Sequence, residues 1–463
     1  MNLATNPVRN SWAGQRIIFD VTRTLLRRRN ATPSGIDRVE FAFLSRLLGS
    51  EPYSDVHFVV TTHVGCGIVP KPLVRTIFSE LSSRWAPDFI PEEKSGYLSL
   101  RSYLETPIDF SRREAARFGL SRPDSWSAWQ HVKLVPQALR RFWPLHLLSL
   151  EAKRIPTFYV HVSHVCLEHP IVLRWASHSA IRPVFFLHDI IPIEYPEFCS
   201  DSAVRVHSRR VETAASFAHT IIVNSHYTKD RIERFLVDSK LRRPPVVVSG
   251  LGTELLANAN SRPIEPSVPY FLHIGTIEAR KNIYHLLNVW RRILAKDGPD
   301  QTPRLVLAGR RGWKSQNVFD VLDGGRELAG HVVEASDLND AELGVLMQGA
   351  AAVLAPSLVE GFGLPGAEAL GRGVPVVASD IAAHREVLGE AAMLLDPTDG
   401  PGWADAIRAL ASSSHFRQNR IDAARRFKPV SWDAHVDLAL AQATGNMTAG
   451  STAPPPRLSE LAV

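Results

Sequence analysis

Glu360-Gly361-Phe362-Gly363-Leu364-Pro365-Gly366-Ala367-Glu368 places two carboxylates at the ends of a glycine-rich turn. Apolar runs at 351–357 and 373–379 flank it, and each has the length of a buried strand. The glycines allow backbone angles and close approaches that other residues do not. Pro365 suits the first turn of a helix. The sequence therefore predicts strand, turn, helix and strand, the repeating unit of a parallel α/β sheet.

The same turn has the chemistry of a ligand site. Free amides at the start of a helix attract anions, so a phosphate group can bind there. Carboxylates at the two ends can then accept hydrogen bonds from the hydroxyls of a sugar and of a ribose. The pattern suits a nucleotide sugar, although glycine-rich turns with nearby acids also occur in α/β proteins that bind no such ligand.

Residues 356–397 resemble the donor-site signature of the retaining, two-domain glycosyltransferases of family four, also called glycosyl transferases group 1. The two glutamates match the E-x7-E motif of that family. The resemblance implies that Glu368 binds the ribose hydroxyls and that Glu360 faces the transferred sugar as a catalytic residue. It also places Phe362, Gly363 and Leu364 in the donor-binding turn.

A second element precedes this motif in the chain. Residues 275–282 follow an apolar strand and open a helix, and they include Arg280 and Lys281. Cations at a helix N-terminus oppose the helix dipole, but they are well placed to neutralise a diphosphate. The segment resembles the R-K-N element of the same family, in which the lysine contacts the donor diphosphate. Many members have an arginine where this chain has Thr276, so the charge rests on Arg280 and Lys281. The alternative is that both are surface cations.

Two elements of the first half also carry the resemblance. His188-Asp189, after an apolar strand, resembles the His-Asp element that places a catalytic histidine beside the transferred sugar. A strand-end histidine can equally be a structural residue. The loop at 32–39 is similar to a subgroup found in bacterial polysaccharide assembly. This similarity implies that Gly35 contacts the donor near its phosphates.

Strands alternate with helices in both halves of the chain, so an α/β fold with parallel sheets is expected. The resemblance implies the GT-B arrangement, two Rossmann-like domains that face each other across a cleft. We place the acceptor-side domain at 1–255, with a basic insertion at 85–155, and the nucleotide-sugar-binding domain at 256–443. Residues 444–463 are rich in Ala, Ser, Thr and Pro, and we expect them to be disordered.

Length and composition favour an ordinary soluble protein of two domains. The 463 residues are 45% hydrophobic and 22% charged, and no run approaches the ~20 apolar residues of a membrane span. The N-terminus lacks the pattern of a signal peptide. Cys66, Cys166 and Cys199 are few and widely spaced, which indicates reduced thiols. A cytoplasmic location is therefore expected.

Positive charge is concentrated in the first half. Residues 1–255 contain 33 Lys and Arg against 24 Asp and Glu, and the remainder contains 20 against 23. Such asymmetry can draw a protein to an anionic membrane, so peripheral binding at the inner face of the membrane stays open. Scattered basic residues are also an ordinary solvated surface. No nucleic-acid-binding module is recognisable, so no nucleic-acid partner is expected.

Metal-binding patterns are missing from the sequence. No Asp-x-Asp pair, which other glycosyltransferases use to hold a metal–diphosphate complex, occurs in the chain, and no His/Cys cluster has metal-ligand spacing. Basic residues and helix amides would stabilise the diphosphate instead. The sequence therefore predicts activity without a metal or another cofactor.

The resemblance as a whole implies a retaining hexosyltransferase. It would move a hexose, with mannose favoured, from a nucleotide sugar to a lipid-linked or polysaccharide acceptor in bacterial envelope polysaccharide synthesis. A GDP-hexose is favoured over a UDP-hexose. One alternative is a nucleotide-sugar epimerase with the same architecture, and another is a non-catalytic, sugar-nucleotide-binding partner in an assembly complex. The intact E-x7-E motif and Lys281 argue against both alternatives.

Overall fold

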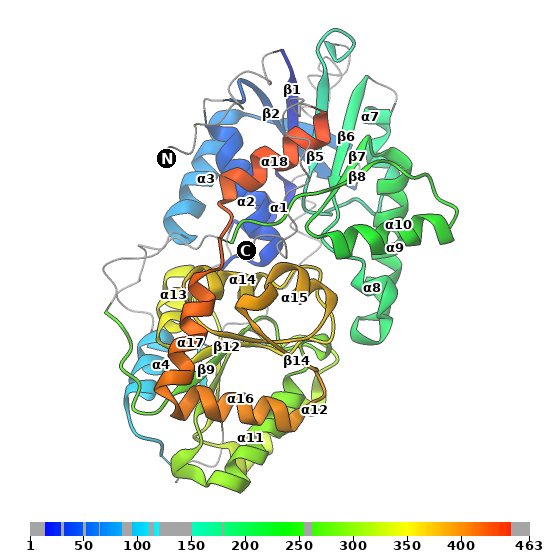
Figure 1. The fold of residues 1–463 in the computed structure, drawn as a ribbon. Coiled ribbons are helices and arrows are strands. Elements are labelled where there is room, and N and C mark those ends of the chain that lie inside the picture. The colour runs from blue at the N-terminus through cyan, green and yellow to red at the C-terminus, as the bar shows by residue number, and fades with distance from the viewer. Residues whose placement is uncertain are drawn as a thin grey trace, which may run out of the picture.

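The computed structural model of the chain has two α/β halves, one above the other in Figure 1. It describes residues 14–28, 32–49, 52–63, 65–85, 95–109, 111, 115–119, 151–177, 180–253 and 262–445. Each half is built on a seven-stranded sheet whose strands are joined mainly through helices. The predicted fold class, α/β with two Rossmann-like domains, is confirmed.

The first sheet has the strand order β3-β2-β1-β5-β6-β7-β8. Only the β2–β3 pair is antiparallel; the other pairs in this sheet are parallel. The sheet is formed by β1 (Arg16–Asp20), β2 (Asp55–Thr62), β3 (Gly65–Val69), β5 (Thr157–His161), β6 (Ile181–Phe186), β7 (Thr220–Val223) and β8 (Val246–Val248). Its central strands are buried along their length, as expected for a parallel sheet covered on both faces.

The second sheet has the order β14-β13-β12-β9-β10-β11-β4, and all of its pairs are parallel. It is formed by β4 (Ala116–Phe118), β9 (Tyr270–Ile274), β10 (Arg304–Ala308), β11 (Val332–Ala335), β12 (Ala352–Ala355), β13 (Val376–Ser379) and β14 (Met393–Leu395). In both sheets the carboxyl ends of parallel strands lie on one edge, where ligands bind in folds of this type.

Helices connect the strands of both sheets. The helix α2, in the first half, begins with a capping box between Ser34 and Asp37. The α-helices are α1 (Thr22–Arg27), α2 (Gly35–Leu48), α3 (Lys71–Trp85), α4 (Ser95–Glu105), α7 (Arg174–Ser177), α8 (Ile191–Glu194), α9 (Asp201–Phe217), α10 (His226–Asp238), α11 (Ile283–Asp297), α12 (Gln316–Gly324), α13 (Asp340–Gly349), α14 (Leu364–Gly371), α15 (Ala382–Val387), α16 (Gly400–Ser412), α17 (Ser414–Arg425) and α18 (Trp432–Thr444). In Figure 1, α14 and α15 lie on the side of the second half that faces the first.

The described parts of the predicted basic insertion at 85–155 are divided between the two halves. Those at 95–109 and 115–119 pack on the second half: β4 is the edge strand beside β11, and α4 contacts both strands. Figure 1 shows α4 on the second half. The buried Arg304 donates hydrogen bonds to the carbonyls of Leu104 (3.0 Å) and Thr106 (2.8 Å), and its guanidinium lies 4.3 Å from the ring centroid of Tyr103. The first-domain range 1–255 therefore includes a segment that belongs physically to the second sheet.

The last helix also departs from the predicted boundary at 443. Although α18 ends the second half in sequence, it packs on α2, β7 and β8 of the first half, where Figure 1 shows it lying across that half. Asp437 of α18 accepts hydrogen bonds from Arg46 (2.8 Å) and from the Tyr53 hydroxyl (2.8 Å). The helix thus ties the end of the described chain back to the first half. The predicted disorder of 444–463 falls mainly on 446–463, which lie outside the described residues.

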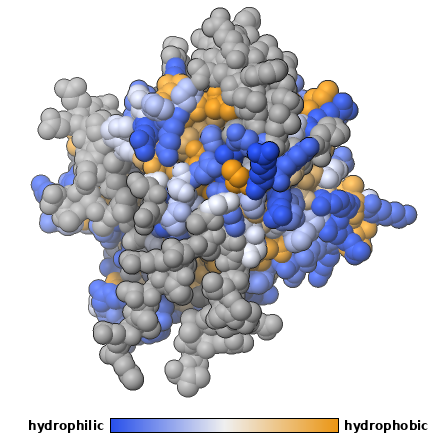
Figure 2. Space-filling view, turned by 90° about the horizontal axis from the view of Figure 1, so that it is seen from above, coloured by the Kyte–Doolittle hydropathy of each residue, from blue (hydrophilic) through white to orange (hydrophobic). Residues whose placement is uncertain are grey.

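Within the described ranges, none of the helices combines the length and the apolar character that crossing a bilayer requires. The three cysteines are buried and are not paired in disulfides. Figure 2 views the molecule from above, where the coloured surface is mainly hydrophilic with smaller hydrophobic patches.

Candidate functional site

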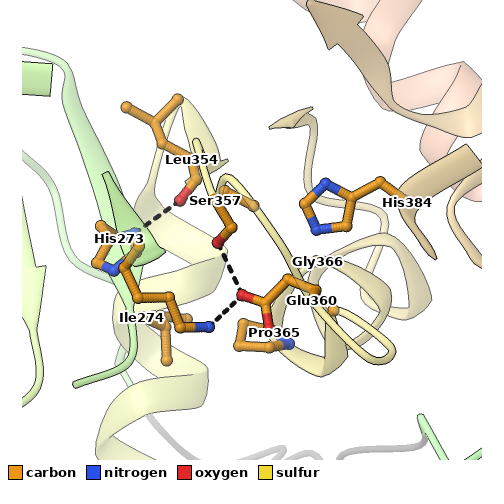
Figure 3. A pocket seen from close by; sticks show the side chains of 11 residues that line it. His273, Ile274, Leu354, Ser357, Glu360, Pro365, Gly366 and His384 are labelled. Carbon is orange, nitrogen blue, oxygen red and sulfur yellow. Dashed lines mark hydrogen bonds and ion pairs between the residues drawn. The ribbon is translucent and has the colours of Figure 1, made fainter. Parts of the chain in front are cut away.

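Glu360 is the centre of a buried ionic cluster at the edge of the second sheet. Its carboxylate is 7% exposed and accepts a hydrogen bond from Lys281 Nζ on one oxygen and from Arg280 Nη1 (2.6 Å) on the other. The Ser357 hydroxyl donates to the same carboxylate at 2.7 Å. Figure 3 shows the Ser357 and Glu360 side chains turned toward each other. The predicted catalytic glutamate and both predicted cations are therefore brought together.

Local backbone geometry explains why the cations reach this carboxylate. Arg280 and Lys281 lie in a 3-10 turn (Ala279–Lys281) between β9 and α11, and Asn282 follows in the left-handed region at φ +56°. Asn282 Nδ2 donates to the carbonyls of Pro356 (3.1 Å) and Pro397 (2.9 Å). Each part of the predicted R-K-N element is thus tied to the segment around Glu360.

The electrostatics hold Glu360 in its ionised form. Burial acts to raise its pKa, but Arg280 and Lys281 outweigh burial and hold the pKa well below its usual range. Burial lowers the pKa of Lys281, and the attraction of Glu360 opposes that shift. Glu278 also pairs with Arg280 at 2.7 Å. Two cations and two carboxylates therefore share the cluster, and Glu360 acts as a charged hydrogen-bond acceptor, not as an acid.

A pocket beside the cluster contains two histidines that the sequence did not single out (Figure 3). His273 Nδ1 lies 3.0 Å from the Leu354 carbonyl, and His384 Nδ1 lies 2.9 Å from the Ser379 carbonyl. A carbonyl only accepts, so each ring carries its proton on Nδ1. Burial lowers the pKa of both, that of His273 to about 4, so the rings are neutral. Their Nε2 atoms, unpaired among the described residues, are acceptors for hydroxyl groups.

The glycine-rich turn adopts the predicted helix start. Gly363 is the N-cap of α14 at φ +87°, where a side chain would be strained, and a Cβ there would lie 2.8 Å from His384 Cδ2. Pro365 lies in the first turn, and no side chain caps the N-terminus. The helix start is thus available to an anion. Phe362 is buried. Its ring lies near Gly250 of the first half, because a Cβ added at Gly250 would lie 3.9 Å from Phe362 Cε2.

Two contacts join the start of α2 in the first half to α14 in the second half. Glu368 lies on α14 with 1% exposure, and its carboxylate forms an ion pair with Arg38 of α2, which also pairs with Asp340 at 2.5 Å. A Cβ on Gly35 would lie 3.9 Å from Leu364 Cδ2. Burial raises the pKa of Glu368, and Arg38 opposes the shift. The predicted donor residues of both halves are therefore neighbours, but Arg38 was missed.

His188 reaches the same turn through its backbone. Its ring is buried and Nε2 donates to the Val162 carbonyl at 2.7 Å, while burial lowers its pKa to about 4. The ring is neutral and Nδ1 is its acceptor. Asn224 Nδ2 donates to the His188 carbonyl, and the Ser225 hydroxyl donates to the Gly361 carbonyl, both at 2.8 Å. His188 is thus held beside the turn that carries Glu360.

Parts of the chain are similar in sequence to known proteins. Residues 257–427 match the family model described as glycosyl transferases group 1. The O-antigen chain mannosyltransferase B of Escherichia coli is 30% identical over 242 residues, covering 51% of this chain and 61% of that protein. The O-antigen chain mannosyltransferase RfbU of Salmonella typhimurium is 28% identical over 228 residues, covering 48% and 59%. The chain thus matches about three fifths of the length of these curated relatives.

Solved structures share the fold. A sucrose-phosphate synthase from Thermosynechococcus elongatus superposes with a TM-score of 0.57 at 16% identity, covering 94% of this chain and all of that one. A UDP-forming trehalose-phosphate synthase from Burkholderia xenovorans superposes with a TM-score of 0.52 at 15% identity, covering 71% and 81%. Residues 257–427 therefore match the glycosyl transferases group 1 model, and the two-sheet architecture is the fold that these solved structures share.

Proposed function

We propose that the protein is a retaining hexosyltransferase that acts without a metal. It moves a hexose, with mannose favoured, from a nucleotide sugar to a lipid-linked or polysaccharide acceptor in bacterial envelope polysaccharide synthesis. The similarity to two O-antigen chain mannosyltransferases supports the sugar and the class of acceptor. We also propose a GDP-hexose, rather than a UDP-hexose, as the donor, from the subgroup resemblance of the loop at 32–39.

One observation carries the proposal: Lys281, Arg280 and Glu360 meet beside the uncapped N-terminus of α14. In the proposed reaction the bond from the sugar to the diphosphate breaks, and negative charge develops on the leaving group. Lys281, Arg280 and the helix start supply positive potential for that charge. Glu368 accepts hydrogen bonds from the ribose hydroxyls. A divalent metal would then not be required for leaving-group stabilisation.

Glu360 and His188 orient the sugar in this proposal. Glu360 is ionised and already accepts three hydrogen bonds from Lys281, Arg280 and Ser357, which makes it a poor nucleophile. His188 is neutral with an acceptor nitrogen. Neither is suited to a covalent sugar intermediate. We therefore propose that the acceptor hydroxyl attacks from the face that the diphosphate leaves, which retains the anomeric configuration.

A transfer assay tests the proposal. Radiolabelled GDP-mannose is incubated with the full-length protein, bacterial lipid-linked oligosaccharide and EDTA, and the labelled product is extracted. We expect transfer that EDTA leaves unchanged and that Lys281→Ala abolishes, while Lys296→Ala, which removes an exposed lysine, leaves it intact. Loss of transfer in EDTA, restored by Mg²⁺, would disprove the metal-free reaction. A product of inverted anomeric configuration by NMR would disprove retention.

The acceptor also suggests a location. A lipid-linked acceptor lies at the membrane, and we propose that the protein works in the cytoplasm, peripherally on the inner face of the membrane. The basic excess of residues 1–255 supports this placement. Co-sedimentation with vesicles of anionic and of neutral lipid tests it. We expect binding to the anionic vesicles only, with a loss at high salt; equal sedimentation with both would count against it.

A further inference from the structure

Arg38 of the first half is bound to two carboxylates of the second. It lies one turn into α2, after the capping box at Ser34, and its side chain is 14% exposed. One terminal nitrogen donates to Glu368 of α14, and the other donates to Asp340 of α13 at 2.5 Å. We call this three-residue ion cluster the Arg38 clasp. It joins α2 of the first half to α13 and α14 of the second half.

The clasp covers the carboxylate that the proposed donor needs. Glu368 is 1% exposed, so the hydroxyls of a ribose cannot reach it in this arrangement of the halves. Arg38 satisfies one of its oxygens, and the start of α2 lies close to the start of α14, since a Cβ on Gly35 would lie 3.9 Å from Leu364 Cδ2. A ribose that binds to Glu368 must therefore displace the guanidinium or the helix behind it.

We propose that the Arg38 clasp is an autoinhibitory contact that holds the ligand-free halves together and must release Glu368 before a nucleotide sugar binds. This inference rests on the proposed function, because the nucleotide sugar is the competing ligand. Binding energy for the ribose is partly used to open the clasp, so the clasp lowers the apparent affinity for the donor. It keeps the ribose site closed to weaker ligands.

A second set of contacts between the two halves does not involve Glu368. Glu386 of α15 accepts hydrogen bonds from the backbone amides of His226 (2.6 Å) and Tyr227 (2.9 Å) at the start of α10. These bonds do not occupy the Glu368 carboxylate, which is proposed to bind the ribose. They are therefore compatible with a closed state that contains the donor. Weakening them destabilises the closed state with and without donor, whereas weakening the clasp destabilises only the ligand-free closed state.

The two sets of contacts provide a matched experiment. The full-length protein is compared as wild type, Arg38→Ala, Glu386→Gln and Arg291→Ala. Arg291 forms an exposed ion pair with Glu327 inside the second half and controls for loss of an arginine. Small-angle X-ray scattering gives the radius of gyration without ligand. Calorimetry gives the dissociation constants of GDP and GDP-mannose. Asp340→Asn, which keeps Arg38 and Glu368, is the second clasp variant if Arg38→Ala does not fold.

We expect Arg38→Ala to increase the ligand-free radius of gyration and to tighten nucleotide binding roughly 5-fold or more. Glu386→Gln should also open the ligand-free protein but leave the affinity close to that of the wild type. Arg291→Ala should change neither quantity. Weaker nucleotide binding by Arg38→Ala would overturn the clasp, because Arg38 would then be a donor contact. An unchanged radius would overturn it as well. If no nucleotide binds to the wild type or to the variants, the proposed donor fails, and the scattering alone decides whether Arg38 holds the halves together.

Discussion

The backbone carbonyl of His188, two residues after β6, lies directly against Gly361 of the second half. A Cβ on Gly361 would lie 2.7 Å from that carbonyl oxygen and 3.1 Å from Asp189 Cβ. The backbone of Gly361 needs no positive φ, so the requirement for glycine comes from the opposite half and not from local conformation. The turn that carries Glu360 is therefore shaped to let the two halves close.

The substitution Gly361→Ala should prevent the two halves from closing fully on each other. The added methyl displaces the His188 carbonyl, and a displacement of about 1 Å between reacting groups can cost roughly 100-fold in rate. We expect about that loss of transfer with little change in the melting temperature. The measurement is the transfer rate beside a thermal melt. In Gly324→Ala nothing lies within 4 Å of the new methyl, so it should keep wild-type activity. Wild-type activity in Gly361→Ala would show that this contact is not required.

Glu360→Gln should destabilise the protein. The change removes the charge that Lys281 and Arg280 share in a buried site, and breaking a buried ion pair from one side costs about 3 kcal/mol or more. Urea denaturation measures the loss. Pairing it with Lys281→Met removes the unpaired cation, so the double variant should lose less stability than the sum of the single changes. Strict additivity would mean that the two groups do not interact.

The free energy of unfolding should also depend on acid pH differently in Glu360→Gln and in the wild type. The folded pKa of Glu360 lies well below its unfolded value of about 4.3. Its contribution is therefore complete above that unfolded value and is lost as the pH falls through the folded pKa. The wild type should lose more stability than Glu360→Gln between pH 5 and more acid conditions. Parallel curves of the free energy of unfolding against pH would contradict this account of the cluster.

Glu40 should produce the opposite pH dependence. It is buried on α2, and burial raises its pKa to about 7 despite hydrogen bonds from the Thr24 amide and hydroxyl, both at 2.6 Å. Its contribution is complete below the unfolded pKa of about 4.3 and is lost as the pH rises toward 7. The wild type should lose stability between pH 5 and 7 by at most about 1.4 kcal/mol per pH unit, and Glu40→Gln should not. Identical slopes would contradict the raised pKa.

Arg304→Met should release the segment 95–119 from the second half. The arginine is fully buried, and its guanidinium holds the carbonyls of Leu104 and Thr106 and the face of Tyr103. Limited proteolysis measures the effect as new cleavage within the segment, together with a stability loss of about 3 kcal/mol. Arg291→Ala, at an exposed pair, should show neither change. Full protease resistance of Arg304→Met would mean that the other contacts of the segment suffice.

Much of this organisation follows from local patterns in the chain. Apolar runs such as 16–21 and 270–275 predicted central strands because they are buried on both faces, and the glycines with Pro365 predicted the start of α14. The strand β4 was missed because Ala-Arg-Phe has no periodicity of its own and pairs with β11 more than two hundred residues later. The last helix was assigned to the wrong half because sequence order does not reveal which surface it packs on.

The candidate site was also predicted only in part from the sequence. Glu360, Lys281 and Arg280 were predicted because their motifs have fixed local spacing, and the structure brings them together. Arg38 lies in the loop 32–39 that carries the subgroup resemblance, but the motif does not reveal its partner, because Glu368 lies 330 positions away and the pair forms between the two halves. His273 and His384 were missed since isolated histidines in strands and helices are usually structural. Contacts made by folding thus account for what the motifs could not predict.

Nucleotide binding at Glu368 is the most direct test of the proposed donor site. Thermal melts in EDTA compare GDP, UDP, GDP-mannose and UDP-glucose on the wild type, on Glu368→Ala and on Glu327→Ala, which removes a carboxylate from an exposed ion pair in the same half. A ligand that binds the folded state raises its melting temperature by mass action. We predict a shift from the guanine nucleotides that Glu327→Ala keeps and Glu368→Ala loses. No shift from any nucleotide with the folded wild type would contradict the account.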